Sequence, residues 1–175
     1  MALGDAITQG AVSKHLQHSY VNLLADKFNF DLLNRGVGGT VFDDKLLAAL
    51  PVNPDIITVG FGVNDYGAGR LVSEKATGFF EKLYRLYHDK KIIVLLPIWF
   101  EGETEKQNGY TLAEGRNFMK ETVRNYPNIT VVDCSNFVPH LPEFYWDNPH
   151  CHPNDLGFLY YGEHLCSAVA ETLQK

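Results

Sequence analysis

The sequence predicts an α/β protein with three layers, α/β/α, of the flavodoxin-like kind, and a five-stranded parallel sheet in the order 2-1-3-4-5. Two observations carry this prediction. Unbroken runs rich in β-branched residues, at 56–59 and 92–96, are typical of strands that are buried on both faces. Helical patterns lie between such runs, and strand alternating with helix implies right-handed βαβ units. The 175 residues suit one domain, which we expect over 1–175.

The elements follow from this alternation. We expect strands at 1–3, 31–34, 56–59, 92–96 and 129–132. We expect helices at 20–28, 72–89, 112–126 and from 155 to the C-terminus, the last capped by Asn154 or Asp155. The buried stripe of the second helix is expected to contain Phe79, Phe80, Leu83, Leu86 and Tyr87. Only three residues precede Gly4, fewer than the roughly five or six of an average strand, so we expect a truncated N-terminus.

Composition limits the classes of partner. The chain is 45% hydrophobic and 21% charged, as in ordinary globular proteins. Its net charge of -6 argues against nucleic acid and against an anionic membrane surface, both of which need a basic face. No apolar run reaches transmembrane length, so we expect a soluble protein, either cytoplasmic or secreted with its signal removed.

Three cysteines, Cys134, Cys151 and Cys166, are an odd number in a chain that is large enough to fold without disulfides. Free thiols are expected, and one disulfide is the alternative. The sequence leaves the oligomeric state open.

Polar segments occur where predicted strands end. They are Gly4-Asp5-Ala6, the glycine-rich segment 34–40, the segment 60–65 and the segment 147–155 before the last helix. Open α/β sheets bind ligands at the carboxyl ends of their strands, so these segments are candidates for one site. A serine at position 6 would make the first segment a nucleophile turn, but the chain has alanine there.

Together the four segments resemble the sequence blocks of the SGNH hydrolases, also called the GDSL esterase/lipase family. Gly4-Asp5-Ala6 matches the first block except at the serine, and Gly39 matches the glycine of the second. Gly62-Val63-Asn64-Asp65 matches the third, and His152-Pro153-Asn154 with Gly157 matches the histidine block. The resemblance spans the whole chain, in the family's order.

The resemblance implies hydrolysis of a carboxylic ester through a serine acyl-enzyme, without a cofactor. The nucleophile position is then Ala6 and the general base is His152, with Asp147 as its orienting carboxylate. The oxyanion hole would consist of the backbone N–H groups of Ala6 and Gly39 and the carboxamide of Asn64. No metal is expected in this mechanism.

The histidine segment departs from the family's D-x-x-H pattern. Asp147 and His150 have that spacing, whereas His152 has the Pro-Asn sequel and the right distance to the last helix. We take His152 as the base and keep His150 as the alternative. If Asp147 does not reach His152, a backbone carbonyl could orient the ring.

Substrate-binding candidates are Asp5, Tyr66, Trp99 and Trp146. We expect Asp5 to hold its turn through backbone N–H groups rather than to act in catalysis. The aromatic residues suit stacking against a sugar, and core packing is their alternative role. We therefore expect a small-molecule or carbohydrate ester as the substrate, with a short acyl group such as acetyl.

Three explanations of Ala6 stay open: an engineered inactivation, a natural binding module that lost its nucleophile, or an error of register with Ser13 nearby. A metal-dependent hydrolase that uses His150, Cys151 and His152 is a further alternative. It is disfavoured because zinc sites use wider spacings and a fourth ligand. We expect His15, His18, His88 and His164 to lie on the surface.

Overall fold

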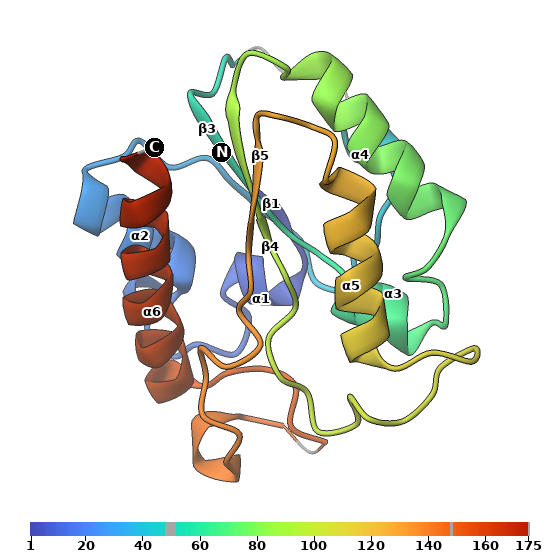
Figure 1. Cartoon of the computed structure of the whole chain (residues 1–175). Helices are drawn as coiled ribbons and strands as arrows, with labels where there is room; N and C mark the ends of the chain where they lie inside the picture. The colour runs from blue at the N-terminus through green and yellow to red at the C-terminus, as the bar shows by residue number, and fades with distance from the viewer. Residues whose placement is uncertain (48–51, 148, 175) are drawn as a thin grey trace.

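The computed structural model describes residues 1–47, 52–147 and 149–174. Its sheet contains five parallel strands in the order β2-β1-β3-β4-β5, which confirms the predicted fold class (Figure 1). The strands are β1 (Ala2–Gly4), β2 (Asn34–Gly36), β3 (Ile56–Gly60), β4 (Lys91–Leu95) and β5 (Ile129–Val132). No helix of the described residues is both long and apolar enough to cross a membrane.

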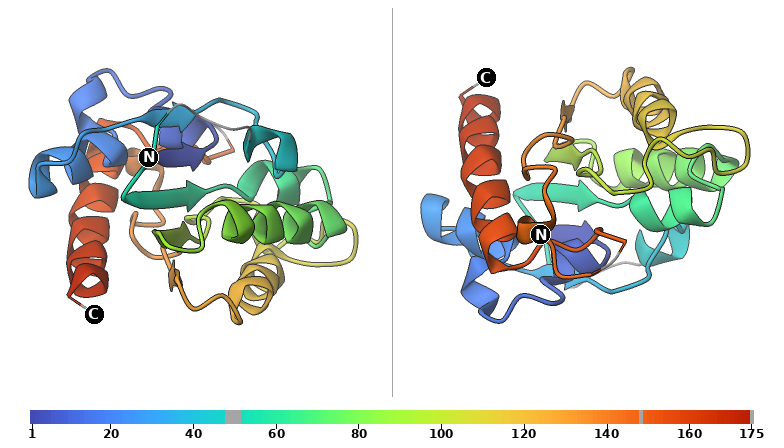
Figure 2. Two further views of the ribbon diagram at one scale, coloured as in Figure 1. Left: turned by 90° about the horizontal axis from the view of Figure 1, so that it is seen from above. Right: turned by 90° about the horizontal axis from the view of Figure 1, so that it is seen from below.

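The long helices form the two outer layers. Helices α2 (Tyr20–Phe28) and α6 (Asp155–Leu173) lie on one side of the sheet, and α4 (Glu74–Leu86) and α5 (Leu112–Val123) lie on the other (Figures 1 and 2). Alternate residues of β4 enter the two cores. Ile92 and Val94 pack in the core beneath α4 and α5, whereas Ile93 and Leu95 pack in the core beneath α2 and α6. Burial on both faces explains why this strand reads as an unbroken apolar run.

Side-chain caps fix where the helices begin. Ser73 Oγ accepts a hydrogen bond from the N–H of Ala76 at the start of α4. Thr111 and Glu114 form a capping box at α5. Asn154 caps α6, as one of the two predicted residues. Helix α2 and strand β5 have the predicted bounds, and the other long elements differ from prediction by a few residues at their ends.

Three local predictions are wrong. Strand β2 begins at Asn34 instead of residue 31, and Leu32 and Leu33 ahead of it are partly exposed. Leu86 is 43% exposed and so does not belong to the buried stripe of α4. Two short helices, α1 (Ala6–Gln9) and α3 (Val63–Gly67), stand where no helix was expected. Helices of one turn are too short to show a helical period in the sequence.

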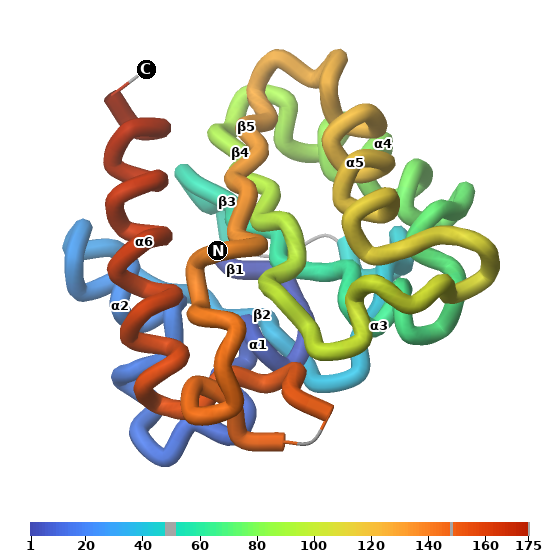
Figure 3. Tube along the Cα trace, turned by 60° about the horizontal axis from the view of Figure 1, so that its bottom comes forward, coloured from blue at the N-terminus to red at the C-terminus, as the bar shows by residue number. Residues whose placement is uncertain are grey.

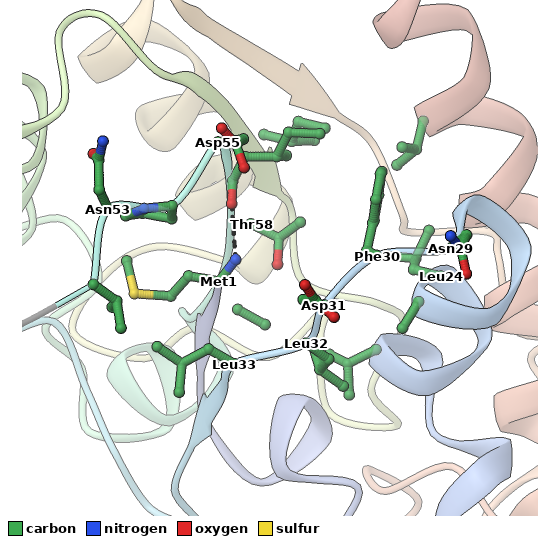
Figure 4. Close-up of a pocket in the computed structure, with 18 residues that line it drawn as sticks. Met1, Leu24, Asn29, Phe30, Asp31, Leu32, Leu33, Asn53, Asp55 and Thr58 are labelled. Atoms are coloured by element: carbon green, nitrogen blue, oxygen red, sulfur yellow. Dashed lines mark hydrogen bonds between the residues drawn. The ribbon is translucent and has the colours of Figure 1, made fainter.

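An open cavity of about 590 Å³ lies at the amino end of the sheet (Figure 4). Met1, Phe30, Leu33 and Asp55 are among its lining residues, and the buried Thr58 lies at its floor. The backbone nitrogen of Met1 donates to the carbonyl of Ile56 at 2.8 Å beside it. This cavity is at the opposite end of the strands from the polar segments that the sequence singles out.

Candidate active site

Ala6 is the first residue of helix α1, directly after strand β1. Asp5 caps this helix, because its Oδ1 accepts the N–H of Ile7 at 3.0 Å. The first N–H groups of a helix have no intrahelical acceptor, so the Ala6 N–H is available to a ligand. Gly36 lets α1 pack tightly against β2, since a Cβ there would lie 2.2 Å from the Gln9 nitrogen.

The glycine-rich loop after β2 runs beside Ala6. The N–H of Gly38 donates to Gln9 Oε1 at 2.8 Å, and a Cβ built on Gly38 would lie 3.7 Å from Ala6 Cβ. Gly39 has a φ of +75°, a left-handed conformation that glycine adopts without strain. The loop backbone is therefore held next to the nucleophile position.

Helix α3 is joined to the same loop. Asn64 Nδ2 donates to the carbonyl of Thr40 at 3.0 Å, which leaves the second hydrogen of its amide group for another acceptor. The buried Asp65 accepts the N–H of Phe42 through both carboxylate oxygens at 3.2 Å. Burial raises the pKa of Asp65 to about 6. These bonds hold Asn64 against the carbonyl of Thr40, the residue that follows Gly39.

The histidine loop is closed at its base by antiparallel pairing. The N–H of Trp146 donates to the carbonyl of His152 at 2.9 Å, and the N–H of Asn154 donates to that of Phe144 at 3.0 Å. Asn154 also donates through Nδ2 to the carbonyl of Glu143 at 2.7 Å while it caps α6. The loop is thus fixed to the first turn of a 19-residue helix.

Asp147 folds back onto His152. Its Oδ1 accepts the N–H groups of Cys151 at 2.8 Å and His152 at 2.9 Å, and its Oδ2 bonds His152 Nδ1. Partial burial acts to raise the pKa of Asp147, but the hydrogen bonds from His152 and Cys151 outweigh it and hold that pKa below its usual value. A carboxylate only accepts, so Nδ1 carries the hydrogen and the Nε2 of a neutral ring can accept a proton.

His150 belongs to a different pair. The backbone N–H of His150 donates to Glu101 Oε2 at 2.9 Å, and the backbone N–H of Glu101 donates to the carbonyl of His150 at 3.0 Å. The Nε2 of His150 lies 3.9 Å from Glu101 Oε2. The structure therefore pairs Asp147 with His152 and uses His150 to join the histidine loop to the loop after β4.

Electrostatics connects the two halves of the site. Burial raises the pKa of Asp5 to about 7, against the opposing effects of the Ile7 N–H and of positive charge on His152. The residue before Ala6 is thus within the electrostatic reach of the imidazole. Segments after β1, β2 and β3 and the loop before α6 meet at one end of the sheet (Figure 3).

Known proteins resemble this chain in sequence and in fold. The model of the GDSL-like lipase/acylhydrolase family matches residues 2–158. The chain belongs to this family. The search of curated proteins found no match.

Solved structures with this fold include three that are informative. A GDSL-like lipase from Bacteroides ovatus, described as putative, has a TM-score of 0.79 at 21% identity, over 99% of this chain and 52% of that one. A possible lipase from Chitinophaga pinensis has a TM-score of 0.72 at 18% identity, over 99% of this chain and 98% of that one. A two-domain esterase active on acetylated mannans has a TM-score of 0.74 at 19% identity, over 99% of this chain and 50% of that one. The chain thus spans about half the length of the first and third of these proteins.

For this member of the GDSL-like family, the predicted substrate-binding set needs correction. Tyr66 is fully buried, and its hydroxyl donates to the carbonyls of Gly102, at 3.1 Å, and Glu105. It supports the loop after β4 and is not free to stack against a sugar. Asp5 is 2% exposed and acts as the cap of α1, in line with its expected structural role, so its side chain is not on a binding surface.

The two tryptophans differ in their surroundings. Trp99 is half-buried and stacks on His140, with ring centroids 5.0 Å apart. Trp146 is 60% exposed, and the Lys14 ammonium lies 5.9 Å from its ring centroid. A surface cavity of about 370 Å³ is lined by Trp146, Lys14, Val12 and the start of α6. Trp146 is therefore the predicted residue that a ligand could stack against.

Sequence reasoning missed the residues that support the site. Arg116 of α5 is buried and donates to the carbonyls of Pro97 and Ile98, both at 2.9 Å, and to Glu103 at 2.7 Å. Gln9 and Glu101 hold the other two loops, as described above. An arginine in a predicted helix is usually exposed to solvent, so nothing in the sequence indicated that Arg116 would be buried against the loop after β4.

Two alternatives from the sequence lose support. Ser13 Oγ lies 2.7 Å from Asp155 Oδ1 and 2.7 Å from the carbonyl of His15, so it is committed to a structural contact. Burial raises the pKa of the Cys151 thiol to about 12, which disfavours the thiolate that a metal site or a substitute nucleophile requires.

Proposed function

We propose that this domain, with serine at position 6, hydrolyses carboxylic esters through a serine acyl-enzyme. The observation that supports it best is the Asp147–His152 pair, which lies on a loop anchored to α6 at the end of the sheet where Ala6, Gly39 and Asn64 lie. A base oriented by a carboxylate, together with prearranged N–H donors, is the apparatus that acyl transfer needs.

The mechanism follows from these groups. The serine oxygen attacks the ester carbonyl while His152 Nε2 takes its proton, and the imidazolium is stabilised by Asp147. The oxyanion accepts hydrogen bonds from the N–H groups at positions 6 and 39 and from Asn64 Nδ2. The C–O bond then breaks, and the alcohol leaves with the proton from His152. Water then attacks the acyl-enzyme in the same way, with His152 as the base, and the carboxylic acid is released.

With Ala6 the chain lacks the attacking oxygen. Loss of the nucleophile from such a triad lowers kcat on the order of a millionfold, so we propose that this chain binds its ester and does not turn it over. The capped helix α1, the Gly38–Gln9 contact and the Asp147–His152 pair all persist around the alanine.

For the substrate we propose a short-acyl ester, with an acetylated carbohydrate first. The exposed Trp146 beside Lys14 offers a flat ring and a donor next to the histidine loop, which suits a sugar. The similar fold of an esterase active on acetylated mannans is in keeping with this choice, although the fold alone does not decide a substrate.

The test is to make Ala6→Ser and assay it with p-nitrophenyl acetate. We expect turnover that the Ala6 chain lacks, and its loss when His152→Ala is added. Adding Asp147→Asn instead should lower kcat by about 10⁴-fold, because the wrong tautomer of the base is then favoured. His150→Ala should leave most of the activity, since His150 contacts Glu101.

The alanine at position 6 favours a second candidate function, that of a carbohydrate-binding domain that has kept the pocket and lost the catalytic activity. If a well-folded Ala6→Ser protein stays inactive on acetyl esters yet binds oligosaccharides, with a loss of affinity in Trp146→Ala, the binding domain is the better description. Hydrolysis by Ala6→Ser that depends on His152 excludes it.

A further inference from the structure

Two imidazoles and a carboxylate gather on the surface at the start of α6, outside the Asp147–His152 pair. One ligand atom from each of the three residues His15, His18 and Asp155 lies within 4.8 Å of the other two. His15 Nδ1 is 2.7 Å from Asp155 Oδ2, and His18 Nδ1 is 3.9 Å from the same oxygen. The two rings are tilted by 45° with centroids 5.0 Å apart, so both can face one point.

Asp155 is held in place by donors that use only one of its oxygens. Oδ1 lies 2.7 Å from Ser13 Oγ and accepts the backbone N–H groups of Lys14 at 2.8 Å and His15 at 3.4 Å. Oδ2 is directed at the two imidazoles instead. Metal-binding carboxylates are commonly oriented by such outer hydrogen bonds, which fix the remaining oxygen for the ion.

His18 supplies an independent observation. Its Nδ1 is shielded from solvent and has no hydrogen-bond partner among the described residues. A buried polar atom without a partner is costly, and native structures rarely retain one without a reason. A cation between His18 and Asp155 would satisfy this nitrogen.

The local charges permit an ion here. The ammonium of Lys14, the residue before His15, lies over the Trp146 ring. The N-terminus of α6 disfavours a cation, but the Asp155 carboxylate lies at that same position and offsets it. Two imidazoles and one carboxylate form a ligand set that suits Zn²⁺ and its neighbours in the first transition series.

We propose that His15 Nδ1, His18 Nδ1 and Asp155 Oδ2 bind one divalent transition-metal ion of the Zn²⁺ type, with water completing a tetrahedral shell. Ligand atoms about 2.0–2.2 Å from zinc are roughly 3.4 Å apart, so the rings need shift only slightly. The hydrogen that His15 Nδ1 shares with Asp155 moves to Nε2 of the same ring, so that the neutral imidazole binds the ion through Nδ1. The ion ties the segment after α1 to the first turn of α6, and these two segments adjoin the helix that begins at Ala6 and the loop that carries His152.

The test uses the full chain without a histidine tag, treated with a chelator and then titrated. Co²⁺ should give visible absorption bands of tetrahedral coordination that saturate at one ion per chain. Zn²⁺ should displace it and raise Tm. His18→Ala should weaken binding at least tenfold and leave Tm of the metal-free protein nearly unchanged, because this nitrogen makes no hydrogen bond.

His88→Ala is the matched control, since His88 is an exposed histidine on the far side of the sheet, after α4. It should bind metal as the parent does, and His15→Ala should weaken metal binding as His18→Ala does. The absence of saturable binding, or equal affinity in His18→Ala, overturns the proposal. Neither result depends on whether Ala6→Ser has esterase activity.

Discussion

At the residue scale, Asp5 performs its helix-capping role with a carboxylate that is buried. Its carboxylate caps α1 and so fixes the N–H of the nucleophile position, yet it is 2% exposed and sits near the charge of Asp65. Burial without a cationic partner in direct contact disfavours the ionised form. The residue that shapes the site therefore makes the folded state sensitive to pH.

We predict that Asp5→Asn removes a part of that sensitivity. The folded pKa is about 7, against 3.8 for a solvated aspartate, so folding takes up a proton between these values. The contribution of Asp5 to the free energy of unfolding is therefore full below pH ~4 and is lost as the pH rises through 7, by on the order of 4 kcal/mol. Asparagine caps a helix as well as aspartate does and carries no proton to lose.

The measurement is urea denaturation at pH 5 and pH 8. The parent should lose stability toward pH 8, and Asp5→Asn should lose less and be the more stable protein there. Asp65, with a pKa of about 6, acts in the same direction in both proteins, so a smaller slope remains in the variant. Asp26→Asn, at an exposed aspartate, is the control. Equal slopes in Asp5→Asn and the parent would refute the argument.

At the scale of elements, the first turn of α6 determines where His152 lies. Asn154 accepts the N–H of Gly157 at 3.1 Å and donates to the carbonyls of Glu143 and Tyr145, which holds both ends of the histidine loop. Gly157 allows Phe144 to approach the helix, because a Cβ there would lie 2.2 Å from the Phe144 carbonyl oxygen. The glycine of the motif thus has a packing role.

We predict opposite effects for two glycine-to-alanine changes in helices. Gly157→Ala forces the Phe144 backbone away and should destabilise the protein by about 1–3 kcal/mol, the usual cost of overpacking. Gly78→Ala in α4 meets nothing within 4 Å and should stabilise it by roughly 0.5–1 kcal/mol through helix propensity. Urea midpoints give both values, and a neutral Gly157→Ala would show that the loop adapts freely.

Elements differed in how well the sequence predicted them, for physical reasons. Helix α2 and strand β5 follow directly from their apolar patterns. Strand β2 was placed too early because Leu32 and Leu33 are apolar but lie at the cavity beside the sheet, where they are only partly covered. The one-turn helices α1 and α3 arise from a cap and from packing on strand ends, which no period reveals.

At the scale of the whole molecule, the sheet order follows from connection rules, and the motifs follow the strands. The sequence could therefore predict which segments converge. It could not predict the contacts that fix them, such as those of Tyr66, whose partners are 36 and 39 residues away. A still longer separation in the sequence, 140 residues between His15 and Asp155, hid the cluster of His15, His18 and Asp155.

The distribution of cysteines across the fold gives a prediction for the whole chain. Cys134, Cys151 and Cys166 are all free in the structure. Cys134 is fully buried in the core beneath α2 and α6, and Cys166 lies on α6 beside the same core. Burial raises the pKa of Cys151 to about 12 and also raises those of Cys134 and Cys166, so few thiolates form near neutral pH.

We therefore expect slow reaction of the native protein with a thiol reagent such as DTNB, because thiolate fraction and access both limit the rate. In denaturant, all three thiols should react at once. Since no crosslink restricts the unfolded chain, Tm should be the same with and without reductant. A count below three in denaturant, or a lower Tm in reductant, would mean that two of these sulfurs are joined in solution, which would require the histidine loop or α6 to move.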